Sequence, residues 1–263
     1  MFLTKKALIK AVLVVLLFFV LGGICLSLSW LMGIIGAEDK LILAIGVIAF
    51  PYGIFLGLMK LYAEGNKIFS SGMKLVRREL KPAQFLREYE SLKASELVVC
   101  KPSISVLQLV MVAQMLLDER DKELGTVEEM LSAVGDKHKN YVKLLKVSCL
   151  FDLGRTEEAE TLFCELQGQK LDLRCRAMVD LILKSDRAVA MGDYKIAEAY
   201  LLRRLDQRLD NLGMLSLHFS LGSIYEKLQD TERAIEHYEY CVENGGETAL
   251  VNKARALIKE LKG

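Results

Sequence analysis

Residues 221–241 read LGSIYEKLQDTERAIEHYEYC. Apolar residues recur at intervals of three and four on both sides of a short polar stretch, which predicts two helices joined by a turn. The first predicted helix carries a Leu-Gly-x-x-Tyr motif, made by Leu221, Gly222 and Tyr225. In the second, Ala234 is followed four positions later by Tyr238. The small residue lets the second helix lie close to the first, and the large one fills the groove beside it.

Two other segments line up with this one without gaps. They are FDLGRTEEAETLF from Phe151 and VAMGDYKIAEAYL from Val189, aligned with EKLQDTERAIEHY from Glu226. Each contains a turn, an alanine and a large residue four positions later: Ala159 with Phe163, Ala197 with Leu201, and Ala234 with Tyr238. Gly154 and Gly192 stand at the predicted turns, where a left-handed backbone favours glycine. Because the alanines lie 38 and 37 residues apart, the sequence predicts an internal repeat of helix pairs.

This pattern resembles the tetratricopeptide repeat, a helix-turn-helix unit of about 34 residues that stacks into a solenoid. The resemblance implies an all-α fold with a TPR-like solenoid over residues 103–263, in which a degenerate pair at 103–134 precedes three pairs and helix 247–261 caps the stack. It is strongest in the final third, because the middle units lack the Leu-Gly-x-x-Tyr motif. The spacing also exceeds 34, which implies slightly longer helices or turns. An unrelated helical bundle is the alternative.

In this family the first helix of each unit lines a concave face. Carried over to this sequence, the resemblance implies a partner-binding groove lined by Tyr141, Leu144, Ser148, Val179, Ile182, Asp186, Ser216, Phe219 and Ser223. Members that hold a partner's terminal carboxylate use basic residues at such places, and none of these residues is basic. We therefore expect an extended or helical peptide held by apolar pockets. The alternative is that helices preceding the solenoid cover part of this lining.

The N-terminal part has two stretches without charged side chains, Ala11–Ala37 and Leu41–Met59. A helix of about 20 apolar residues crosses a bilayer core. The sequence thus predicts an all-α transmembrane hairpin over residues 1–63, with spans at about 11–31 and 41–62, and a basic juxtamembrane linker with an amphipathic helix over 64–102. Lys and Arg flank both outer ends, which predicts a multi-pass protein of a bacterial inner membrane with its N-terminus and C-terminal domain in the cytoplasm. A cleaved signal peptide and an inverted topology are the alternatives.

The second predicted span carries small residues on one face, Ala49, Gly53 and Gly57. Small residues at this spacing let two membrane helices approach closely, which is consistent with closure of the hairpin, self-association or docking to another membrane protein. The basic stretch Lys67–Lys81 is expected to attract anionic lipid headgroups. Neither span holds an Asp, Glu, Arg or His, so a transporter or channel has no support.

Composition argues against several classes of function. The 35 Lys+Arg and 34 Asp+Glu give a net charge of +1, which disfavours a nucleic-acid binder. The six cysteines form no Cys-x-x-Cys pair, and no phosphate loop, nucleophile elbow or His-Glu-x-x-His is present, so neither a metal, a cofactor nor an enzyme is predicted. We expect His237 to be a solvated helix residue and His218 to pack inside its unit.

The resulting hypothesis is a membrane-anchored, non-enzymatic adaptor or scaffold that binds protein or peptide partners at the cytoplasmic face of the membrane. The alternative is an oligomerising assembly module in which the hairpin, rather than the solenoid groove, makes the partner contact.

Overall fold

A computed structural model describes residues 52–57, 66–94 and 103–263, together with the single positions 13, 20, 24 and 63. The side chains of residues 137, 181 and 182 are not part of this description. The chain forms two compact units: residues 1–68 with 95–103, and residues 69–94 with 104–263. Of the first unit, the described residues 13, 20, 24, 52–57 and 63 are helical and mostly exposed.

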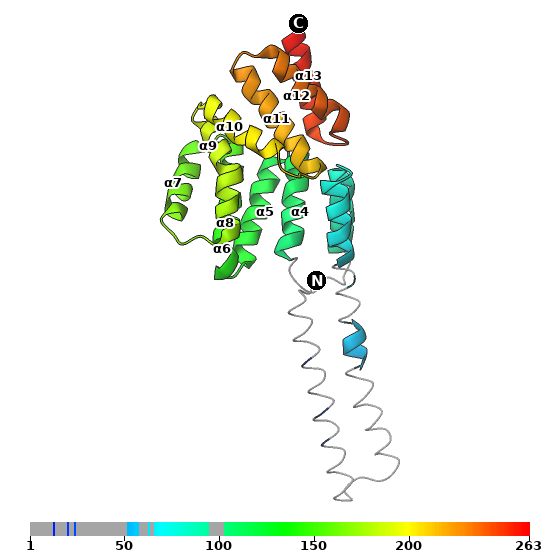
Figure 1. The fold of residues 1–263 in the computed structure, drawn as a ribbon. Helices are drawn as coiled ribbons and strands as arrows, with labels where there is room; N and C mark the ends of the chain where they lie inside the picture. The colour runs from blue at the N-terminus through cyan, green and yellow to red at the C-terminus, as the bar shows by residue number, and fades with distance from the viewer. Residues whose placement is uncertain are drawn as a thin grey trace, which may run out of the picture. The chain divides into compact units, whose positions relative to one another are not determined.

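The second unit is a series of helix pairs (Figure 1), and its described residues include no strand. Pair 1 consists of helical residues 69–77 and α3 (Pro82–Ala94). The next three pairs are α4 (Ile104–Leu116) with α5 (Arg120–Ala133), α6 (Asp136–Asp152) with α7 (Thr156–Gln167), and a composite first helix with α10 (Tyr194–Leu205). That composite helix joins α8 (Leu173–Met178), the π-helix η1 (Val179–Leu183) and α9 (Lys184–Ala190). Pair 5 is α11 (Asn211–Lys227) with α12 (Thr231–Asn244), and α13 (Ala249–Lys262) packs on α12.

One turn conformation recurs in all five pairs. A residue with positive φ lies between the two helices of each pair: Leu80 (54°), Asp118 (62°), Gly154 (72°), Gly192 (79°) and Gln229 (60°). In four of the pairs the next amide donates a hydrogen bond to the carbonyl oxygen five residues earlier, at N···O distances of 2.8–2.9 Å. This bond satisfies a carbonyl left free at the end of the first helix. The turns lie 36 to 38 residues apart. They mark five pairs in the described residues, one more than the sequence predicts.

The two helices of each pair pack closely where the aligned alanines lie. Ala159, Ala197 and Ala234 are fully buried, and the large residues that follow them are buried as well: Phe163, Leu201 and Tyr238. In pair 5 a Cβ at Gly222 would lie 2.7 Å from the Tyr238 ring. The glycine therefore lets the buried ring lie directly against α11.

Pair 1 was assigned to a linker from the sequence, and this assignment needs correction. Val76, Leu80, Phe85 and Tyr89 are buried, with exposed fractions from 0 to 4%. A Cβ at Gly72 would lie 2.7 Å from the Phe85 ring and 2.8 Å from Leu109 of α4. Residues 69–94 thus share a core with the solenoid.

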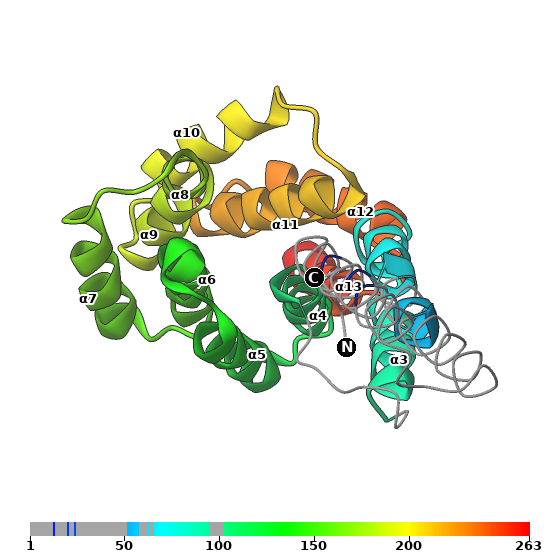
Figure 2. The same cartoon turned by 90° about the horizontal axis from the view of Figure 1, so that it is seen from below.

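The pairs follow a curved path, so that the last pair returns to the first two. Figure 2 shows α4, α6, α8, α9 and α11 toward the centre of the view, with α5, α7 and α10 around the outside. In Figure 1, α11, α12 and α13 lie above α4 and α5. The amide of Glu247 donates to the carbonyl oxygen of Leu80 at 2.9 Å, and Lys253 Nζ lies 2.6 Å from Asp118 Oδ1. The turns of pairs 1 and 2 therefore contact the turn before α13 and α13 itself.

The structure contradicts the inner-membrane localisation predicted from the sequence. None of the helices that it describes combines the length and the apolar character needed to cross a bilayer. The predicted spans, 11–31 and 41–62, lie mostly outside the described residues. Ala49 is among those outside, whereas Gly53 and Gly57 lie in the exposed helical segment 52–57.

Candidate functional site

Side-chain contacts link the first helices of pairs 2, 3 and 4, and we call the surface along these contacts the inner face. At one end of it, Gln108 of α4 donates through Nε2 to the hydroxyl of Tyr141 on α6, at 2.7 Å. The guanidinium of Arg174 on α8 lies over the Tyr141 ring, 3.7 Å from its centroid, and its Nη2 lies 3.5 Å from Gln108 Oε1. Each of these three side chains comes from a different pair. The Arg174 guanidinium is exposed and has donors left for a partner.

A second contact joins pairs 3 and 4 farther along the inner face. Ser148 Oγ of α6 donates to Asp186 Oδ2 of α9 at 3.0 Å. Burial raises the pKa of Asp186 to about 7, and the negative charge of Asp152 adds to this shift. The Ser148 hydrogen bond and the Arg204 guanidinium oppose it. Burial in turn lowers the pKa of Arg204, against the effect of Asp186.

The π-helix η1 lies just before Asp186 in the sequence. A π-helical turn contains more residues than an α-helical turn and so changes the direction of the side chains that follow it. The sequence pattern predicts a regular helix here. The side chains of α9 therefore point in other directions relative to α8 than a regular helix would give them. The position of Asp186 on the inner face changes accordingly.

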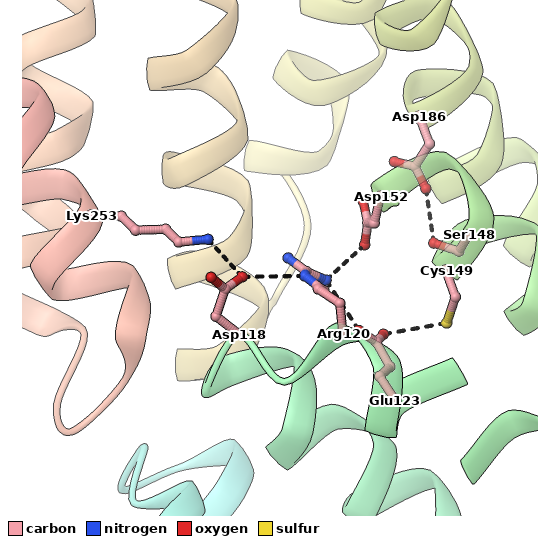
Figure 3. A network of polar contacts seen from close by, with 8 residues as sticks. All are labelled: Asp118, Arg120, Glu123, Ser148, Cys149, Asp152, Asp186 and Lys253. Atoms are coloured by element: carbon pink, nitrogen blue, oxygen red, sulfur yellow. Dashed lines mark hydrogen bonds and ion pairs between the residues drawn. The ribbon is translucent and has the colours of Figure 1, made fainter. Parts of the chain in front are cut away.

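An ion-pair group, which we call the Arg120 cluster, lies at the turn side of pairs 2 and 3 (Figure 3). Arg120 Nη1 lies 3.1 Å from Glu123 Oε2 and 3.2 Å from Asp152 Oδ2, and its Nε lies 3.4 Å from Asp118 Oδ1. Asp118 also pairs with Lys253 of α13. Burial raises the pKa of Glu123 and of Asp152, and the Arg120 guanidinium opposes both shifts. One arginine thus holds three carboxylates from two consecutive pairs.

Cys149 extends this cluster into the core. Its Sγ donates to Glu123 Oε1 at 3.3 Å, and burial raises the pKa of the thiol above its ordinary value. The thiol is therefore kept protonated, which makes it a poor nucleophile. Among the described residues, no group of three or more His, Cys, Asp and Glu side chains is arranged to hold a metal ion.

The structure brings together only part of the groove predicted from the sequence. Tyr141, Ser148 and Asp186 take part in the inter-pair contacts above. Leu144 is a correction, because it is fully buried in the core between pairs 2 and 4 and cannot line an open surface. Val179 is half-buried at the edge of that core, and the side chain of Ile182 lies outside the described residues.

The three predicted groove residues of α11 belong to a separate region. Ser216, Phe219 and Ser223 are half-buried. The Phe219 ring packs against Tyr238, with centroids 5.6 Å apart, and the Ser223 hydroxyl hydrogen-bonds the Tyr238 side chain. The contacts of Tyr141, Ser148 and Asp186 on pairs 2 to 4 are polar.

Pair 5 contains a histidine pair that the sequence did not predict. His218 Nδ1 of α11 and His237 Nδ1 of α12 lie 2.9 Å apart. The His218 ring stacks on Tyr240 at 3.7 Å, and the His237 ring stacks on Tyr225 at 5.4 Å. Burial lowers the pKa of both histidines. His237 is thus a packing residue rather than a solvated one, because its ring fills the space between the two helices.

Comparison with known families adds one match. Residues 215–244 match the family model of the tetratricopeptide repeat. This region covers most of α11 and α12 and includes Leu221, Gly222 and Ala234. A repeat of this kind indicates a role in binding other proteins, since stacked repeats present an extended concave surface. No curated protein and no solved structure matches the chain.

Gln108, Arg120 and Arg174 are not among the site residues predicted from the sequence. A signal for Arg120 was present, because it follows the turn residue Asp118 two positions later, as Thr156 and Thr231 follow Gly154 and Gln229. Recognising Asp118 as the turn residue would have aligned pair 2 with the others. Nothing comparable marks Gln108 or Arg174, because their role depends on the distance between helices of different pairs.

Proposed function

We propose that this chain is a non-enzymatic adaptor that binds a protein or peptide partner along the inner face of pairs 2 to 4. The observation that carries the proposal is the contact among Gln108, Tyr141 and Arg174. It joins three consecutive first helices and holds an exposed guanidinium in a fixed position. Fixed polar groups on rigid helices lose little conformational entropy when a partner binds.

The character of the face supports a polar partner segment. Arg174 offers donors at one end, and the exposed carboxylate of Asp152 offers acceptors at the other. The tetratricopeptide repeat at residues 215–244 supports a protein partner, because such repeats present their first helices to other chains. A chain segment that carries both an acidic and a basic side chain fits this distribution of charge.

The test compares the affinity of matched variants for one partner segment, which is first selected from a peptide library with the wild-type chain. Tyr141→Ala and Arg174→Ala are expected to weaken binding about tenfold, the loss of one cation–π contact or one charged hydrogen bond. Arg176→Ala is the control, because Arg176 lies in the same short helix and is exposed. Equal affinities for all four proteins would rule out the inner face as the binding surface.

A further inference from the structure

We propose that the contacts between the C-terminal helices and the turns of pairs 1 and 2 form a releasable clasp. The clasp is defined by two groups. One group is Asp210, Asn211, Gly246, Glu247 and Lys253, from pair 5 and α13. The other is Arg77, Arg78, Leu80 and Asp118, from the turns of pairs 1 and 2.

Polar contacts join the two sides of the clasp. Arg77 Nε lies 2.7 Å from Asp210 Oδ2, and Asn211 Nδ2 donates to the carbonyl oxygen of Arg78 at 2.6 Å. The Lys253–Asp118 pair and the bond from the Glu247 amide to Leu80 complete the set. The side chains of both ion pairs are 31 to 43% exposed. Exposed ion pairs contribute little to stability and are screened by salt.

A hollow in the surface borders the clasp. It is open to solvent, has a volume of about 350 Å³ and lies between Leu117, which follows α4, and the residues that begin α13. The residues around it are Leu117, Gly246, Glu247, Thr248, Ala249, Val251, Asn252 and Arg255. Water can therefore reach this side of the junction between α13 and the turn of pair 2.

The backbone on the N-terminal side of the clasp is strained. Leu80 and Asp118 both have left-handed φ angles, which are unfavourable for residues other than glycine. On the opposite side Gly246 also has a positive φ, and a Cβ there would lie 2.8 Å from the carbonyl oxygen of Leu80. The left-handed turn occurs in all five pairs, so the clasp is distinguished by its exposed polar contacts rather than by this backbone conformation.

The clasp is connected to the inner face through one carboxylate. Asp118 binds Lys253 on one side and Arg120 on the other, and Arg120 holds Asp152. When the clasp opens, Asp118 keeps only Arg120 as its cationic partner. Any effect of the clasp on partner binding rests on the proposed function. The opening of the clasp itself does not.

Hydrogen exchange of the Glu247 amide tests the clasp without any partner, because this amide bonds across it. Lys253→Met in the full chain is expected to speed Glu247 exchange about fivefold and to leave the Tyr238 amide unchanged. In an Asp118→Asn background, which keeps a residue suited to the left-handed backbone, Lys253→Met should have little further effect. Lys259→Met is the matched control, since Lys259 lies on the exposed side of α13.

The same measurement at two salt concentrations separates opening from unfolding. Raising the salt from 0.05 to 0.5 M should speed Glu247 exchange and leave Tyr238 exchange unchanged. The proposal is overturned by an unchanged Glu247 rate in Lys253→Met, or by Glu247 and Tyr238 rates that change together. Neither result depends on partner affinity. The clasp can therefore be overturned while the proposed function stands, and the reverse.

Discussion

Gly222 lets the two helices of pair 5 pack closely against each other. Gly222→Ala places a methyl group 2.7 Å from the Tyr238 ring, which is fully buried and cannot move aside. Overpacking should outweigh the gain in helix propensity and lower the free energy of unfolding by about 1–2 kcal/mol. Urea denaturation measures this change. Gly125→Ala on α5 is the control, with nothing within 4 Å of its Cβ, and should leave stability unchanged or raise it by up to about 1 kcal/mol.

Asp186 makes stability depend on pH in the direction opposite to most carboxylates. Its pKa is about 7 when folded, against an ordinary value of 3.8. Well below pH 3.8 the Asp186 carboxyl is protonated in both the folded and the unfolded state, so it causes no change of stability with pH there. As the pH rises from 4 to 7 the unfolded state releases this proton first, and the folded state is destabilised.

Asp186→Asn should therefore stabilise the protein at pH 8, by about 1–3 kcal/mol, and have a much smaller effect at pH 4. The amide can still accept the hydrogen bond from Ser148, so the contact on the inner face is retained. Urea denaturation at the two pH values provides the measurement. An equal change at both values would show that the effect is one of packing and not of charge.

The histidine pair has the opposite pH response. The pKa of each histidine is lowered in the folded state, by burial above all, while Glu236 favours the charged form and Arg233 opposes it for His237. Stability from this pair is complete above about pH 6.5 and is lost as the pH falls from there through the lower folded values. Thermal denaturation of His237→Asn should show a weaker decline below pH 6.5 than the wild type. His138→Gln, which replaces an exposed histidine, should keep the wild-type decline.

At the scale of the element, the turns hold the repeat together. Gly192→Ala forces a Cβ into a left-handed backbone with φ of 79°, although nothing lies within 4 Å of it. We expect a loss of about 1–2 kcal/mol from this conformation alone. Gly168→Ala is the matched change, because Gly168 has a helical φ of −72° and should be neutral or slightly stabilising. Equal losses in urea denaturation would mean that the left-handed turn is not what Gly192 provides.

The sequence indicates the elements well where a glycine or the alanine pattern marks them, as in pairs 3, 4 and 5. Pair 1 was missed because its turn uses Leu80, a residue that rarely adopts a left-handed backbone and so gives no signal. The π-helix was missed because the apolar spacing of Val179–Leu183 is compatible with an ordinary helix. The clasp could not be predicted, since it depends on how far the solenoid curves over five pairs.

At the scale of the whole solenoid, the first helices of pairs 2 to 4 lie toward the centre of the view and α5, α7 and α10 lie around the outside (Figure 2). The resemblance to the tetratricopeptide repeat implied a surface of this kind, and the family match at residues 215–244 shows one such repeat in pair 5. The chemistry of the surface was only partly predictable. Tyr141, Ser148 and Asp186 follow from their position in the repeat, whereas Arg174 and Arg120 depend on distances between helices of different pairs.

The most direct test of the account is a footprint of the bound partner segment on the full chain, measured by backbone chemical shifts or hydrogen exchange. The account predicts changes concentrated on α4, α6, α8 and α9, around Gln108, Tyr141 and Asp186, with α7 and α10 unaffected. Changes confined to the outer helices α7 and α10 would contradict it.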